Sequence, residues 1–206
     1  MGSLDYKNKC SYNVFEVIHL SYTYKPFPLE KRIYKLYRTL RINKPEDINE
    51  ARIARELSIF LTYSDKRSYS HENGRFQLIN IDKNLDDFQQ REVFFHELCH
   101  LLRHSGYQYK VMPDSFRDLQ EWDANHFTRY AAIPFHMLRL LDWTSPSLVK
   151  DMSKLFKVSE EICQYRVDHV HRNAKLKDKA YTLNRDRGEE QHEQSSHVFE
   201  EVKSRY

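Results

Sequence analysis

The sequence contains no long apolar run, and nothing at its start resembles a secretion signal. A helix that crosses a membrane needs about 20 consecutive apolar residues, and no stretch here approaches that length. The first residues, Met1 to Tyr6, lack the basic and then apolar order of a signal peptide. We therefore expect a cytoplasmic protein that has no membrane partner.

The sequence also has few cysteines and glycines, and its net charge is small. The 206 residues include three cysteines, Cys10, Cys99 and Cys163, which form no Cys-x-x-Cys pair and therefore argue against a disulfide framework or a thiolate zinc site. Only four residues are glycine and 40% are hydrophobic, which favours a helix-rich globule. The net charge of +3 is small for a phosphate-binding surface, so we expect no direct binding of nucleic acid.

Hydrophobic spacing predicts helices on both sides of a short β-rich stretch. We expect helices over 29–40, 45–57, 87–103, 115–132, 146–156 and 159–172, and strands over 59–63 and 75–81. Turn residues at 71–74 separate the two strands, which predicts a small antiparallel sheet. The predicted fold class is α+β, mostly helical, with a C-terminal helical segment.

The same pattern predicts four parts of the chain. Residues 1–28 form an N-terminal extension, and 29–144 form the main domain. A pair of helices over 145–173 packs on that domain, and the charged segment 174–206 is expected to be a disordered tail.

The motif His96-Glu97-Leu98-Cys99-His100 lies inside a predicted helix. At about 100° per residue, the two histidines are about 40° apart on the helix, so both imidazoles can reach one metal ion. Glu97 can approach a water on that ion without binding the ion itself, as a general base must. Eleven histidines produce such a motif by chance in a few per cent of chains, but the surrounding apolar residues predict a buried helix whose polar groups need strong partners.

A catalytic zinc ion takes three protein ligands and keeps one position for water. Glu121, on the next predicted helix, is the candidate for the third ligand, and Asn125 lies one turn further along and could accept a hydrogen bond from a ligating histidine. Rival candidates remain: Asp118, Asp123, His126 and His104. His104 lies about 12 Å along the axis from His96, so a supporting role suits it better than ligation.

The segments 96–104 and 121–127, followed by Ile133-Pro134, resemble the ImmA/IrrE family of bacterial and phage metallopeptidases. The similarity extends from about Leu29 to Arg172 and implies a zincin-like fold with His96, His100 and Glu121 as Zn²⁺ ligands and Glu97 as the base. Two features depart from the family pattern: Cys99 replaces its usual glycine, and the segment 128–132 replaces a more aliphatic run.

This resemblance implies a zinc-dependent endopeptidase that cleaves a regulatory protein, such as the helix-turn-helix repressor of a phage or mobile element. Zinc would lower the pKa of its bound water, and Glu97 would take a proton from that water. His104, Tyr63 and Tyr107 are candidates for stabilising the oxyanion. If the strand over 75–81 is an exposed edge, it could pair with an extended substrate.

Two other functions compete with proteolysis. The helices over 146–156 and 159–172 could form a helix-turn-helix in a DNA- or protein-binding regulator without catalysis, but Glu160 and Glu161 would repel phosphates at the start of the second helix. Zinc could also be purely structural, as in a sensor, but such sites usually have four ligands and are rich in cysteine. Three ligands favour catalysis.

Overall fold

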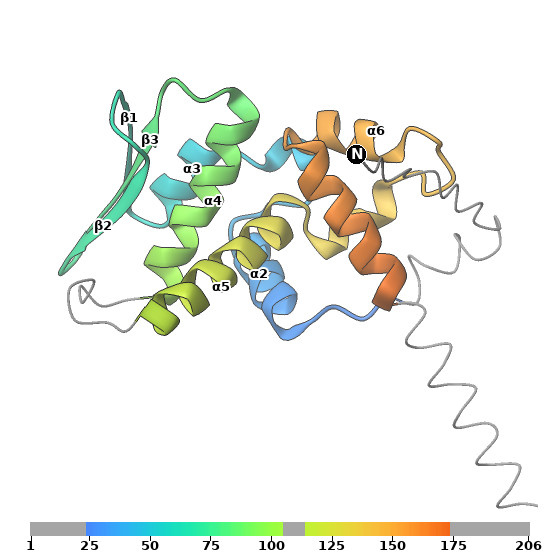
Figure 1. Ribbon diagram of the computed structural model, residues 1–206, viewed down its shortest axis with the longest axis horizontal. Coiled ribbons are helices and arrows are strands. Elements are labelled where there is room, and N and C mark those ends of the chain that lie inside the picture. The colour runs from blue at the N-terminus through green and yellow to red at the C-terminus, as the bar shows by residue number, and fades with distance from the viewer. Residues whose placement is uncertain (1–23, 105–113, 174–206) are drawn as a thin grey trace, which may run out of the picture.

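The computed structural model describes residues 24–104 and 114–173 (Figure 1). Most of the predicted extension 1–28 and all of the predicted tail 174–206 lie outside these residues, as do Cys10 and Tyr107. The described elements are α2 (Pro28–Thr39), η1 (Pro45–Asp47), α3 (Glu50–Glu56), β1 (Ile59–Ser64), β2 (Tyr69–Asn73), β3 (Phe76–Asp82), α4 (Asp87–Arg103), α5 (Asp114–Ala132), η2 (Phe135–Leu140), α6 (Leu148–Phe156) and a final helix, 160–173.

This mostly helical α+β architecture confirms the predicted fold class. In Figure 1 the sheet lies at one end of the molecule and the final helix at the other, with α4 and α5 between them. None of the described helices is long and apolar enough to cross a membrane.

The sheet has three strands in the order β1-β3-β2 and is mixed rather than wholly antiparallel. Strand β3 runs parallel to β1 and antiparallel to β2. The prediction of a turn at 71–74 was wrong for most of that segment, because β2 continues to Asn73 and the turn lies at Gly74, whose φ of +60° suits glycine. Strand β2 has few apolar residues, and its backbone pairs with β3 from Tyr69 to Asn73.

Helix α4 packs between the sheet and α5, and it carries the His-Glu-x-x-His motif. Asp86 caps its N-terminus, where the carboxylate accepts hydrogen bonds from the backbone N–H groups of Phe88 and Gln89, both at 2.9 Å. Phe94, Phe95, Leu98 and Cys99 are fully buried. Burial of each large apolar side chain contributes about 1.5–3 kcal/mol, so the helix that carries both histidines is held firmly in place.

The helical pair after residue 145 packs against the rest of the fold. Met152, Phe156, Val158 and Cys163 are fully buried in the same hydrophobic core as α4. In addition, Arg91 of α4 donates a hydrogen bond to the carbonyl of Phe156 at 2.6 Å. The apolar residues of this pair therefore serve packing.

A buried ion pair joins the beginning of α2 to the final helix. Arg166 is fully buried and pairs with Glu30, which is 1% exposed. Arg166 also donates to the carbonyl of Ile133 at 3.1 Å, to the hydroxyl of Tyr24 at 3.1 Å and to Nδ1 of His169 at 3.1 Å. Because an uncompensated buried charge is costly, these partners must come together when the chain folds.

Acid is expected to destabilise the fold through His169. Burial and the charge of Arg166 lower the pKa of His169 from 6.5 to about 4. The unfolded chain therefore binds the proton first, so stability that is present above pH 6.5 is lost as the pH falls toward 4. Between pH 7 and 5, we expect wild type to lose about 1 kcal/mol more than His169→Gln, after allowance for solvent screening. Urea unfolding at both pH values measures this, and equal losses would contradict it.

Candidate metal centre

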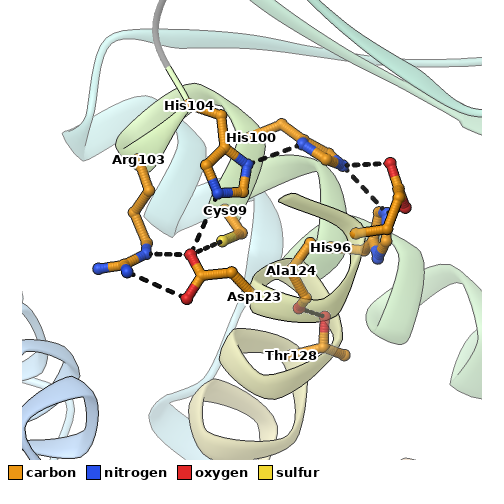
Figure 2. Close-up of polar contacts among 9 residues, drawn as sticks. His96, Cys99, His100, Arg103, His104, Asp123, Ala124 and Thr128 are labelled. Atoms are coloured by element: carbon orange, nitrogen blue, oxygen red, sulfur yellow. Dashed lines mark hydrogen bonds and ion pairs between the residues drawn. The ribbon is translucent and has the colours of Figure 1, made fainter. Parts of the chain in front are cut away.

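Three side chains from α4 and α5 bring their ligand atoms together. Nε2 of His96 lies 3.1 Å from Nε2 of His100, a contact drawn as a dashed line in Figure 2. The carboxylate of Glu121 places one oxygen 3.1 Å from Nε2 of His96 and the other 3.4 Å from Nε2 of His100. The structure therefore unites the three residues that the sequence singled out as ligands.

These distances suit a tetrahedral metal ion. Zinc bonds of about 2.0–2.1 Å to nitrogen and oxygen in tetrahedral geometry place neighbouring ligand atoms about 3.3 Å apart. The Nε2 atoms of His96 and His100 lie 3.1 Å apart, close to that value, and each lies 3.1 to 3.4 Å from one of the two oxygens of Glu121. The side chain of Glu121 is 53% exposed and that of His96 24%, so the open side of the cluster faces solvent. Three ligands and an open fourth position are typical of a catalytic site.

His100 is suited to metal binding at neutral pH. Burial, reinforced by the nearby His96, lowers the pKa of His100 to about 4. The imidazole is therefore neutral near pH 7 and keeps a lone pair for a metal ion, as ligation requires.

Glu97 lies beside the cluster and contacts the sheet. Its Oε2 accepts a hydrogen bond of 2.7 Å from the hydroxyl of Ser70 on β2. Glu97, Ser70, His96, His100 and Glu121 all line one cleft of about 800 Å³. A carboxylate held at the wall of an open cleft next to the ligand atoms is suited to act on a water molecule there.

The cleft is bordered by three residues of β2, whereas β3 contributes to it only Asp82, its last residue. Residues 67–71 line it, whereas β3 is the central strand and pairs with a neighbour on each side. The hypothesis that the strand over 75–81 offers an exposed edge is therefore wrong, because both of its edges are occupied. Among the described strands, β2 is the one with a free edge at the cleft.

The rivals for the third ligand position are placed elsewhere. Asp123 accepts two hydrogen bonds from Arg103, at 2.6 and 3.0 Å, and lies 3.1 Å from Nε2 of His104. Although burial alone would raise the pKa of Asp123, its bonds with Arg103 and His104 lower it. Asp118 and His126 belong to neither group of ligand atoms found in the described residues.

Cys99, His104 and Asp123 also lie close together, but they do not suit a second metal ion. Burial and the charge of Asp123 raise the pKa of Cys99 to about 12, so the thiol stays protonated. Arg103 already occupies both oxygens of Asp123. This group is therefore a hydrogen-bonded network.

Other predicted supporting residues need correction. Asn125 is exposed, and within the described part of the chain no hydrogen bond joins it to His96 or His100; the partner of His100 is instead His104. Tyr63 lines a separate cavity with Glu50 and Arg91, so it does not face the cleft. Tyr107 lies outside the described residues. Ser70 and His71, which do line the cleft, were missed because no local pattern marks a residue that tertiary packing brings to a site.

Comparison with known proteins shows that this chain is similar to a peptidase family and to two proteins of Bacillus subtilis. A family model described as the IrrE N-terminal-like domain, of a peptidase family, matches residues 54–168, which include all four residues of the candidate centre. The uncharacterized protein YqaB of Bacillus subtilis strain 168 is 33% identical over 146 residues, covering 70% of this chain and 84% of YqaB. The phage-like element PBSX protein XkdA of the same strain is 33% identical over 147 residues, covering 70% of this chain and 73% of XkdA.

Proposed function

Because the chain belongs to the peptidase family of the IrrE N-terminal-like domain, we propose that it is a zinc-dependent endopeptidase. The observation that carries this proposal is the convergence of His96, His100 and Glu121 on one point, with Glu97 beside them in an open cleft. Two imidazoles and one carboxylate are the donor set of several zinc peptidases. The proposed reaction is hydrolysis of a peptide bond.

The residues of the cleft divide the work of hydrolysis. When bound by His96, His100 and Glu121, zinc would supply a Lewis acid that activates water and polarises the substrate carbonyl. Glu97 takes a proton from the attacking water and passes it to the leaving amine, so that one water is consumed for each bond cut. The hydrogen bond from Ser70 holds one oxygen of Glu97 and leaves the other for the water.

We propose a DNA-binding repressor as the substrate. The similarity to a protein of a phage-like element supports this proposal, as does the resemblance to peptidases that act on such regulators. The cleft is also open and bordered by a free strand edge, and an extended segment of a protein could pair with that edge. Exposed linkers between the domains of a repressor are segments of this kind.

Metal removal provides the test. Zinc-loaded protein is expected to cut a helix-turn-helix repressor from its own genetic neighbourhood at a defined bond, which mass spectrometry of the products identifies. Treatment with a chelator should abolish cleavage, because the ligands alone do not activate water, and added zinc should restore it. Cleavage that persists after complete removal of metal would contradict the proposal, as would intact repressors after incubation with the zinc-loaded protein.

A further inference from the structure

His100 is connected through two hydrogen-bonded side chains to an arginine on its own helix. Its Nδ1 lies 3.0 Å from Nδ1 of His104, and Nε2 of His104 lies 3.1 Å from Oδ2 of Asp123 on α5. Arg103 then donates to both oxygens of Asp123. Figure 2 shows this sequence of contacts leading from Arg103 to the ring of His100. We call these four residues the relay.

The chemistry of Asp123 gives the relay a direction. An ionised carboxylate can only accept hydrogen bonds, so Nε2 of His104 must be the donor. In a neutral ring, Nδ1 of His104 then carries no proton and must accept from Nδ1 of His100. His100 therefore has its proton on Nδ1 and a free lone pair on Nε2, the atom that faces His96 and Glu121. This conclusion follows without reference to any metal.

The relay is shielded from water and joins two helices. The side chains of His104 and Asp123 are 11% and 19% exposed, which strengthens hydrogen bonds that solvent would otherwise weaken. Asp123 lies two residues after Glu121 on α5, while Arg103 and His104 end α4. The relay therefore also fixes α5, which carries Glu121, against the helix of the two histidines. In the described residues no comparable partner holds the second ring nitrogen of His96.

We propose that Arg103, Asp123 and His104 are positioning residues that preset the tautomer and orientation of His100 for metal binding. They act through His100 and do not contact the ion. The inference rests on the proposed zinc site, but it concerns how that site is prepared and not which bond it cuts. It assigns a function to the ion pair between Arg103 and Asp123.

Zinc affinity is the first measurement. His104→Phe keeps a ring of similar size and removes both hydrogen bonds, and Asp123→Asn removes the charge that directs the relay. Each is expected to raise the dissociation constant for zinc about 10–100-fold, the effect typical of groups that orient a ligand. His126→Phe, the same change at a histidine of α5 outside the relay, is the matched control and should bind zinc like wild type. Competition with a chelating dye measures all four proteins.

The tautomers are the second measurement, and in the wild type they can be read without relying on any variant. Long-range proton–nitrogen NMR spectra of the zinc-free wild type should show His100 protonated on Nδ1 and His104 on Nε2. A structural role alone would leave the tautomer of His100 unchanged in Asp123→Asn, whereas the relay predicts a mixture of both forms.

Three results would overturn the inference: a proton on Nδ1 of His104 in the wild type, an unchanged tautomer of His100 in Asp123→Asn, or wild-type zinc affinity in a folded His104→Phe protein. These outcomes can be distinguished from a failure of the proposed peptidase activity. A protein that shows the expected tautomers, and whose zinc affinity falls as expected in His104→Phe and Asp123→Asn, yet cuts no repressor, would refute the peptidase proposal and support the relay.

Discussion

Replacing Glu97 by glutamine is expected to slow cleavage about 10²–10⁴-fold, the contribution typical of a general base. Glutamine has the same shape as glutamate, and its carbonyl oxygen can still accept the hydrogen bond from Ser70, so the fold and the cleft are retained. It cannot accept a proton from the water. The variant should therefore bind as much zinc as wild type while it leaves the substrate intact, which metal analysis and a timed cleavage assay measure together.

Glu72→Gln is the matched control, because Glu72 lies on β2 beside the cleft but does not line it. It should retain the wild-type rate of cleavage. The Glu97 variant also separates proteolysis from the competing function. If Glu97→Gln retained full regulatory activity on its partner, the protein would be a binding regulator that has a peptidase fold, and catalysis would have no part in its action.

Replacing Glu121 by glutamine is expected to remove both zinc and activity. The change deletes the one anionic ligand of the three. The loss of zinc affinity should therefore exceed the 10–100-fold effect expected for residues that hydrogen-bond to a ligand without binding the ion, and the rate of cleavage should fall as zinc is lost. Equilibrium dialysis against buffered zinc measures the affinity. Since the side chain is about half exposed, the substitution should leave the free energy of unfolding of the zinc-free protein nearly unchanged.

Asp118→Asn provides the control on the same helix. Asp118 was a rival for the third ligand position, but it is exposed and lies outside the cluster. It should therefore bind zinc like wild type. The opposite pattern, with zinc lost from Asp118→Asn and kept by Glu121→Gln, would mean that α5 presents a different face to α4 from the one described.

Three features could not be predicted from the sequence: strand β2, the parallel pairing of β1 with β3, and the position of Asn125. Strand β2 was missed because its residues are mostly polar and its stability comes from pairing with β3, a contact that no local propensity reports. The parallel pairing of β1 with β3 is likewise a matter of topology. Asn125 was expected to support a ligating histidine because it lies one turn from Glu121, but in the folded protein its side chain is exposed.

The sequence by itself determined what depends on the geometry of a single helix. Asp86 sets the beginning of α4, and the period of about 3.6 residues per turn brings His96 and His100 to one face with Glu97 alongside. Only the tertiary structure decided which acidic residue meets them, which strand borders the cleft and how His100 is held. These features join residues that are distant along the chain, and packing between helices and sheet, not local spacing, sets the distances between them.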